Sequence, residues 1–134
     1  MKKPNDETRP LVKVKRSQIG LGLFAQEDIP KGQVVIEYTG ERISTDEADR
    51  RGGRYLFTVT DEIVIDGKGR ENLSRYINHA CRPNAQAEHD ETDDRIYIRA
   101  IRKIRDGEEI TYNYGREYLE DLIGITGCKC SACV

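Results

Sequence analysis

Short runs of alternating apolar and polar residues, and short runs rich in β-branched residues, recur along most of the chain. Because the side chains of a strand point alternately to its two faces, such runs are typical of half-buried β-strands. They fall at 11–16, 20–25, 33–40, 55–60, 63–66, 85–89, 95–101 and 110–114. The first run alternates apolar with basic residues, which favours an edge strand. The pattern predicts a mainly β fold.

Helical signals are few. Ser44 opens a short polar segment and Glu47 follows three positions later, which predicts a helix with a capping box. The helix should end by Gly52 and Gly53, and residues 116–123 are compatible with one or two further helical turns. The predicted strands do not alternate with helices in βαβ order. A doubly wound nucleotide-binding fold is therefore excluded.

Composition narrows the class of protein. The chain has 134 residues, of which 37% are hydrophobic and 34% are charged, and this predicts one small domain. We find no apolar run long enough to span a membrane, and the first residues lack the apolar centre of a secretory signal. We therefore expect an intracellular protein, cytoplasmic, nuclear or nucleoid-associated according to the organism, without membrane contact. A net charge of -2 with mixed signs argues against direct nucleic-acid binding.

The four cysteines are Cys81, Cys128, Cys130 and Cys133. Thiolate ligands are more typical of an intracellular chain than disulfides. Disulfides among the last three would close strained small loops, whereas tetrahedral zinc accepts such close spacing. A closed four-thiolate site then needs Cys81 as its fourth ligand. The alternative is a loose tail with incidental cysteines and one buried Cys81.

Two segments concentrate chemically distinctive side chains. Residues 73–84 read L-S-R-Y-I-N-H-A-C-R-P-N, and residues 110–115 read I-T-Y-N-Y-G. The second segment places Tyr112 and Tyr114 on one side of a predicted strand. Together with the C-x-C-x-x-C spacing at the end of the chain, these segments resemble the SET-domain protein lysine methyltransferases and their zinc-binding post-SET segment.

The resemblance implies a fold and a domain division. The expected fold is the β-clip or SET fold, with small curved antiparallel sheets, short helices and a C-terminal pseudoknot. Residues 1–10 are expected to be a flexible N-terminus, residues 11–116 the SET domain and residues 117–134 the post-SET zinc-binding segment. Two positions depart from the family pattern, because Ala80 stands where Ser is commoner and Asn113 replaces the usual Asp.

The resemblance assigns catalytic roles to three tyrosines. Tyr114 matches the tyrosine usually held catalytic, Tyr112 matches a position linked to the number of methyl groups added, and Tyr38 would form a wall of the lysine channel. A half-buried strand aromatic is the alternative for Tyr38. A lysine amine has a pKa near 10.4, so freeing its lone pair at pH 7 costs roughly 4–5 kcal/mol. An apolar aromatic channel and a nearby sulfonium both lower that pKa.

The cofactors implied by the resemblance are S-adenosylmethionine and a structural zinc ion. Glycines in G-x-G at 20–22 would let the backbone approach the donor closely, although a hairpin turn explains the same pattern. Asn78 and His79 match the pair whose backbone and Asn side chain hold the donor. The residues expected to bind S-adenosylmethionine are Gly20, Gly22, Leu23, Arg75, Tyr76, Asn78, His79 and Tyr114.

The implied function is mono- and dimethylation of lysine in a histone or another basic chromatin protein, by a monomer or homodimer. No cysteine-rich segment precedes residue 11, which leaves substrate selection less defined than the reaction. A catalytically silent SET-like module that binds a peptide is the first alternative. A small zinc protein that binds nucleic acid is a second, disfavoured by the charge. The acidic stretch at 90–94 could attract a basic substrate, but a solvated hairpin tip is the favoured explanation.

Overall fold

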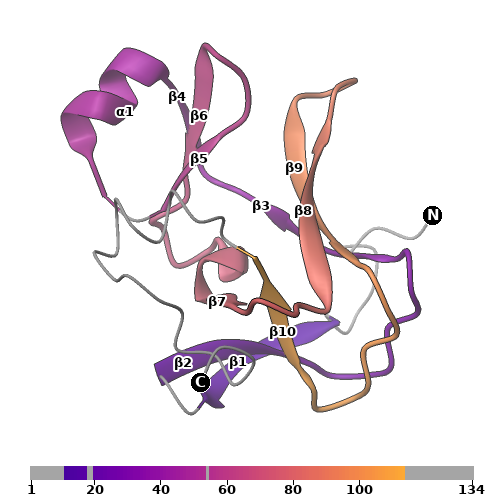
Figure 1. The fold of residues 1–134 in the computed structure, drawn as a ribbon. Coiled ribbons are helices and arrows are strands. Elements are labelled where there is room, and N and C mark those ends of the chain that lie inside the picture. The colour runs from indigo at the N-terminus through magenta and orange to yellow at the C-terminus, as the bar shows by residue number, and fades with distance from the viewer. Residues whose placement is uncertain (1–10, 18–19, 54, 114–134) are drawn as a thin grey trace.

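A computed structural model describes residues 11–17, 20–53 and 55–113. Strands dominate these residues, as the hydrophobic pattern predicts (Figure 1). The elements are β1 (Val12–Ser17), β2 (Gly20–Ala25), β3 (Val34–Tyr38), β4 (Glu41–Ser44), α1 (Thr45–Arg51), β5 (Leu56–Thr58), β6 (Ile63–Asp66), the 3-10 helix η1 (Leu73–Tyr76), β7 (Asn78–His79), β8 (Ala85–Asp90), β9 (Arg95–Ala100) and β10 (Glu109–Tyr112). No described helix is both long and apolar enough to cross a membrane.

The strands form three small sheets. Their orders are β1-β2-β10-β7, β3-β9-β8 and β4-β6-β5. In Figure 1 the four-stranded sheet occupies the lower part of the molecule, and the other two stand above it. The strand β1 lies at a sheet edge, which confirms the prediction from its alternating apolar and basic residues. The mainly β fold predicted from the sequence is confirmed.

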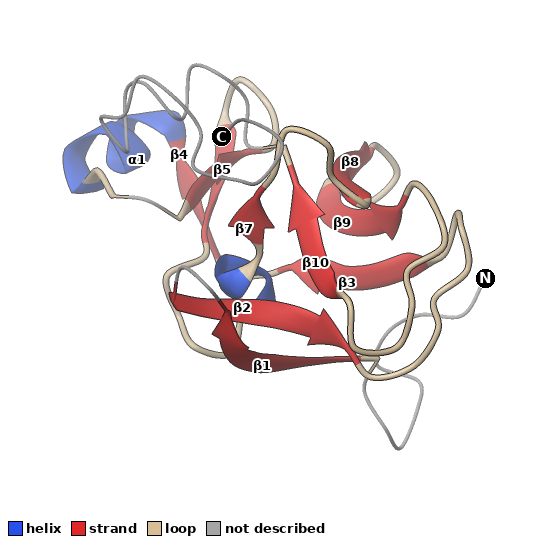
Figure 2. Ribbon diagram, turned by 60° about the horizontal axis from the view of Figure 1, so that its bottom comes forward, coloured by secondary structure: helices blue, strands red, loops and turns tan. Residues whose placement is uncertain are grey.

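One pairing differs from the predicted antiparallel arrangement. The strand β7 runs parallel to β10, with Asn78 opposite Thr111 and His79 opposite Tyr112. Figure 2 shows these two strands side by side at the centre of the molecule. The pairing brings together the two chemically distinctive segments of the sequence. Their meeting point is therefore part of the backbone hydrogen-bond ladder and does not depend on side-chain contacts alone.

The buried side chain of Asn84 reinforces this meeting point. Its Nδ2 donates to the carbonyl oxygen of Glu109 at 2.7 Å, and its Oδ1 accepts from the backbone N–H of Thr111 at 2.9 Å. Asn84 is only 2% exposed, so replacing it with an apolar residue would leave backbone groups unpaired. The amide acts as an additional strand partner for β10.

The main core lies against the four-stranded sheet. Leu23 of β2 and Ile110 of β10 are paired in register, and both are fully buried. They belong to one cluster with Ile77 and with Ile98 of β9. Each such side chain removed from water contributes about 1.5–3 kcal/mol. The core therefore fixes β10 through Ile110, close to the end where Tyr112 projects.

The short helix begins and ends largely as its sequence predicts. The Oγ of Ser44 accepts from the backbone N–H of Glu47 at 3.1 Å, and Gly52 ends the helix with a φ of 63°. The second half of the predicted capping box takes another form. The carboxylate of Glu47 accepts from the side chains of Arg50 and Arg51 on the next turn. Two cations within reach make a stronger partner for a carboxylate than one backbone N–H.

Candidate active site

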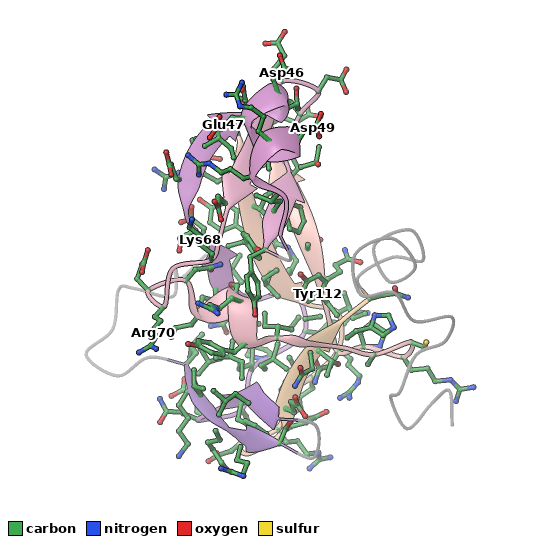
Figure 3. All side chains as sticks on the ribbon, turned by 90° about the vertical axis from the view of Figure 1, so that its left-hand side faces the viewer. Asp46, Glu47, Asp49, Lys68, Arg70 and Tyr112 are labelled. Carbon is green, nitrogen blue, oxygen red and sulfur yellow. The ribbon has the colours of Figure 1, made fainter. Side chains whose placement is uncertain are left out.

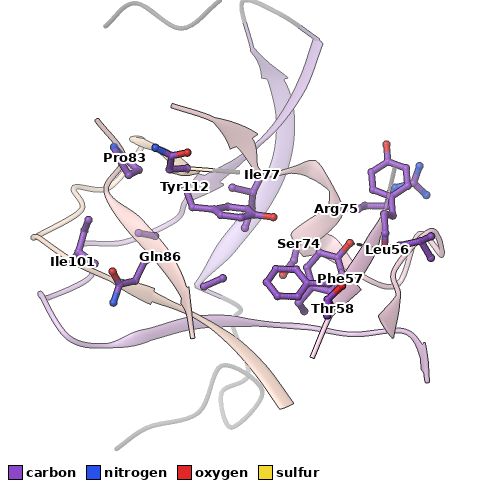
Figure 4. A pocket seen from close by; sticks show the side chains of 15 residues that line it. Leu56, Phe57, Thr58, Ser74, Arg75, Ile77, Pro83, Gln86, Ile101 and Tyr112 are labelled. Atoms are coloured by element: carbon purple, nitrogen blue, oxygen red, sulfur yellow. Dashed lines mark hydrogen bonds between the residues drawn. The ribbon is translucent and has the colours of Figure 1, made fainter. Parts of the chain in front are cut away.

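A pocket of about 470 Å³ opens where the three sheets approach one another (Figure 4). Its walls are largely apolar and aromatic, and they come from β3, β5, η1, β8 and the end of β10. The lining residues are Tyr38, Tyr55, Leu56, Phe57, Thr58, Ser74, Arg75, Ile77, Pro83, Ala85, Gln86, Ala87, Ile101, Tyr112 and Asn113. Such a pocket suits a long aliphatic side chain that ends in one polar group.

Tyr38 forms a rigid wall of this pocket. Its ring is 5.1 Å from the ring of Phe57, and only 4% of the residue is exposed. Its hydroxyl donates to the carbonyl oxygen of Tyr55 at 2.8 Å, which joins β3 to the residue that precedes β5. Gly67 lies against the same ring, because a Cβ at that position would come within 2.5 Å of it. The tyrosine thus lines the pocket mainly with its ring.

Tyr112 lies on the opposite side of the pocket, at the end of β10. Figure 4 shows its ring beside Ile77, across the cavity from Phe57. The residue is half-buried, and its backbone carbonyl accepts from the N–H of Ala80 at 3.2 Å. Asn113 follows at the rim and is exposed. The third predicted catalytic tyrosine, Tyr114, lies outside the described residues.

Arg75 lies between the pocket and the helix η1. Its guanidinium carbon is 4.5 Å from the ring centre of Tyr55 and 5.3 Å from that of Tyr76. One terminal nitrogen donates to the carbonyl oxygen of Lys68, and the buried Nε has no acceptor among the described residues. Arg75 thus lines the pocket and contacts the ring of Tyr76, which does not itself line the pocket.

Asn78 connects β7 with β2 and β10 on the other side of the same segment. Its Nδ2 lies 2.7 Å from Oε2 of Glu109, 3.1 Å from the carbonyl oxygen of Leu21 and 3.5 Å from Oγ of Ser17. A Cβ at Gly22 would lie 2.5 Å from the same carboxylate oxygen and 3.2 Å from Nδ2 of Asn78. Glycine at this position therefore makes room for the two side chains to meet.

The remaining predicted donor-binding residues differ in their surroundings. Leu23 is fully buried in the core, so only its backbone could contact a donor. Gly20 is exposed at the start of β2 with a φ of 122°, which favours glycine. His79 is half-buried, and burial lowers the pKa of its imidazole. Neutral imidazole is therefore favoured at this position.

The predicted zinc site is only partly within the described chain. Cys81 is exposed on the loop after β7, and its Sγ lies 3.6 Å from Nε2 of His79. The other predicted ligands, Cys128, Cys130 and Cys133, lie outside the described residues. Within residues 11–17, 20–53 and 55–113, no group of three or more potential ligands could hold a metal ion.

Several residues of the site were not assigned by sequence reasoning. Tyr55 and Phe57 line the pocket from the region of β5, and Glu109 contacts Asn78 from β10. Asn72 is 1% exposed and accepts from the N–H of Thr39 beside the pocket wall. Asn84 belongs to the quoted motif, so its presence there was the available signal. Tyr55 and Phe57 gave only the pattern of an ordinary strand.

Comparison with known families decides the classification. The family model described as SET domain matches residues 20–115. The chain belongs to the SET-domain family. The match covers the pocket, the β7–β10 meeting point and every described residue that was expected to take part in catalysis or donor binding.

Curated relatives of this SET domain are histone-lysine N-methyltransferases. The H3 lysine-4 specific protein of Aspergillus oryzae is 40% identical over 126 residues, which cover 81% of this chain and 10% of that protein. The protein trr of Drosophila melanogaster is 41% identical over 142 residues, covering 98% of this chain and 6% of trr. Histone-lysine N-methyltransferase 2D of Homo sapiens is 41% identical over 128 residues, which cover 87% of this chain and 2% of that protein. The chain thus spans a tenth or less of the length of these relatives.

Solved structures show the same fold. Apo ctPRC2 in an autoinhibited state matches with a TM-score of 0.73 and 41% identity, over 84% of this chain and 16% of that chain. The same complex in an autoinhibited conformation bound to S-adenosylmethionine matches equally well, with a TM-score of 0.73. The SET fold, with small sheets and little helix, is confirmed.

Proposed function

We propose that this SET domain transfers a methyl group from S-adenosylmethionine to a lysine side chain of a histone or another basic protein. The observation that carries the proposal is the pocket itself. Its aromatic walls, Tyr38 and Phe57 on one side and Tyr112 on the other, suit the aliphatic stem and amine of lysine. The relatives' names support the reaction, and the S-adenosylmethionine-bound neighbour supports the donor.

The pocket provides what methyl transfer to an amine needs from a protein. Apolar walls disfavour the charged ammonium and so lower the pKa of an entering lysine. The ring of Tyr38 is held by its hydrogen bond to Tyr55, so its wall is rigid before substrate arrives. Holding the amine in line with the methyl carbon can account for a large part of the rate enhancement. A strong general base is not required, which is consistent with a pocket lined by a single charged residue, Arg75.

The donor would bind on the far side of the β7–β10 meeting point. We assign this role to Gly20, Gly22, Leu23, Arg75, Tyr76, Asn78, His79 and Tyr114. Asn78 fits the assignment, because its Oδ1 accepts no hydrogen bond from a described residue while its Nδ2 is fully engaged. When bound, S-adenosylmethionine supplies the electrophilic methyl group. The chain's own residues hold it and keep it aligned with the lysine pocket.

We assign structural zinc to Cys81, Cys128, Cys130 and Cys133 in a post-SET segment at residues 117–134, which follows a SET domain at 11–116. The exposed Cys81 thiol beside β7 supports this ligand set. A zinc site here would attach the last segment of the chain to the strand that carries Asn78 and His79. The ion would therefore support the donor site as well as the tail.

The substrate assignment follows from the relatives and the pocket together. Relatives are named as acting on histone H3 lysine 4, so a chromatin protein in the nucleus is the first substrate class to test. We assign mono- and dimethyllysine as the products, because Tyr112 lines the cavity and its hydroxyl takes up space there. A catalytically silent peptide-binding module remains the alternative function, and it predicts binding of the basic peptide without methyl transfer.

Methyl transfer from labelled S-adenosylmethionine to a histone mixture tests the proposal. We expect incorporation by the unaltered chain and a steep loss in Tyr114→Phe. Tyr97→Phe is the matched control, because the hydroxyl of Tyr97 donates to Asp93 on the β8–β9 hairpin and the residue does not line the pocket. If the unaltered chain binds a basic histone peptide but transfers no label to it, the result would support the silent peptide-binding module instead.

A further inference from the structure

We infer that Glu109 is a positioning residue that fixes the orientation of the Asn78 side-chain amide toward the methyl donor. The inference rests on the proposed function, because it assumes that Asn78 faces the amino-acid part of S-adenosylmethionine. The carboxylate of Glu109 would act on the donor only through Asn78, without touching the donor itself. It assigns a role to a residue that neither the sequence motifs nor the pocket single out.

The hydrogen bonds of Asn78 leave only one orientation for its amide. The group 2.7 Å from Oε2 of Glu109 also lies 3.1 Å from the carbonyl oxygen of Leu21. Both of these neighbours are acceptors, so the group between them must be the NH₂. An amide turned by 180° would place its oxygen against a carboxylate and a carbonyl. The surroundings therefore determine an assignment that is otherwise ambiguous for asparagine.

The backbone holds Glu109 in place for this contact. Glu109 is paired with Phe24 of β2, and two residues later Thr111 is paired with Asn78 of β7. The central position of β10 thus fixes the distance between the two side chains. Gly22 completes the arrangement, because any Cβ there would meet the carboxylate oxygen at 2.5 Å.

The consequence concerns which end of the amide remains for a ligand. The Oδ1 of Asn78 accepts no hydrogen bond from a described residue, and it is an acceptor without a positive charge. Such an atom suits a cationic donor, and the α-ammonium of S-adenosylmethionine is the group of that chemistry. A flipped amide would present N–H groups to the ammonium and would repel it. Glu109 thus selects for ligands that carry the ammonium.

Calorimetry of the full chain with two ligands tests this role. S-adenosylhomocysteine carries the α-ammonium, whereas 5′-methylthioadenosine lacks it and keeps the adenosine and the sulfur. Glutamine can face Asn78 with either end of its amide, so Glu109→Gln leaves only the Leu21 carbonyl to fix the orientation of Asn78. We expect Glu109→Gln to weaken S-adenosylhomocysteine binding about tenfold, as for a lost hydrogen bond to a charged group. Binding of 5′-methylthioadenosine should stay within twofold.

A double-mutant cycle separates positioning from a general structural effect. If Glu109 acts through Asn78, then Glu109→Gln should change affinity no further once Asn78→Ala is present. Glu88→Gln is the matched control, because Glu88 accepts from Arg99 and Gln86 on the outer hairpin. It should leave both affinities unchanged. Additive losses in the cycle, or equal losses for both ligands, would overturn the inference.

Gly22→Ala provides a second variant if Glu109→Gln does not fold. The atom nearest to the added Cβ is the end of the flexible Glu109 side chain, so the carboxylate would move away while the backbone stays. The same selective loss for S-adenosylhomocysteine is expected. An unaltered chain that binds neither ligand would refute the proposed donor. An unaltered chain that binds both, with no change in Glu109→Gln, would refute only the role of Glu109.

Discussion

At the scale of single residues, the tyrosines of the pocket have different tasks. The hydroxyl of Tyr38 donates to the carbonyl of Tyr55, so this residue joins two segments while its ring forms a wall. Tyr112 stands across the cavity at the end of a strand held by the core. Tyr38 therefore both lines the pocket and links two segments, whereas Tyr112 lines the pocket from the opposite side. Sequence alone left Tyr38 undecided between a wall of the lysine channel and an ordinary half-buried strand aromatic.

Tyr112 should determine how many methyl groups are added. Its hydroxyl occupies space near the pocket and can hold a water molecule that further methylation must displace. Displacing an ordered water costs on the order of 1–2 kcal/mol, or roughly a five- to thirtyfold rate penalty. We expect mono- and dimethyllysine from the unaltered chain, and a shift to higher methylation without loss of turnover in Tyr112→Phe. Mass spectrometry of a methylated peptide measures this, and mainly trimethyllysine from the unaltered chain would contradict it.

At the scale of elements, one side chain connects the helix α1 to both neighbouring strands of its sheet, in addition to the packing of Ala48 against that sheet. Arg51 donates to Glu41 on β4, to Glu47 on its own helix and to Asp66 on β6. Its guanidinium lowers the pKa of Glu41, and these carboxylates raise the pKa of Arg51 in turn. Figure 3 shows the helix projecting at one end of the molecule, with Asp46, Glu47 and Asp49 labelled around it. Arg51 links this projecting element to the rest of the fold.

Removing the side chain of Arg51 should lower the free energy of unfolding, whereas removing that of its neighbour Arg50 should not. The side chain of Asp66 is 6% exposed, and Arg51→Met would leave its carboxylate without the guanidinium partner. An unpaired buried polar group costs about 1–3 kcal/mol. Arg50→Met is the control, because the side chain of Arg50 is 74% exposed and contacts only Glu47 among the described residues. Urea unfolding should show a clear loss for the first variant and almost none for the second. Equal midpoints would contradict the prediction.

The elements also show how far sequence reasoning reaches. Alternation and turn residues predicted eight of the ten described strands near their observed bounds but missed β4 and β7, and Ser44 predicted the start of α1. These are local signals, carried by neighbouring residues. The parallel pairing of β7 with β10 has no such signal, since β7 contains only Asn78 and His79. It follows from the folding of distant segments together, and the sequence did not predict it.

The residues of the candidate site also separate into those that the sequence could name and those that it could not. Asn78 and Tyr112 could be named from the motif, and the structure places Tyr112 at the pocket and Asn78 at the adjoining meeting point. Glu109 and Asn84 acquire their contacts from β10 lying against β2 and β7. Periodicity gives the face of a strand but not its neighbours in a sheet. The partners of each motif residue were therefore beyond prediction from sequence alone.

At the scale of the whole molecule, the proposed zinc site should join the end of the chain to the donor site. Metal analysis should give one zinc per chain, and chelation should make the chain beyond about residue 116 sensitive to protease. Structural zinc contributes about 10–16 kcal/mol in small peptides, so activity should fall with the metal. Cys81→Ser should reproduce both effects. Purified protein that is active without zinc would contradict the assignment.

The order in which the sheet is assembled has a consequence for synthesis in the cell. The strand β10 pairs with β2, which precedes it by roughly 85 residues. At about 5–20 residues per second, a ribosome needs roughly 4 to 17 s to make the stretch between them. Until then Leu23, fully buried in the finished fold, lacks its partner Ile110 and stays accessible to chaperones. Nascent chains of this SET domain should therefore bind chaperones for several seconds during synthesis. Truncated chains that end before residue 109 should be degraded.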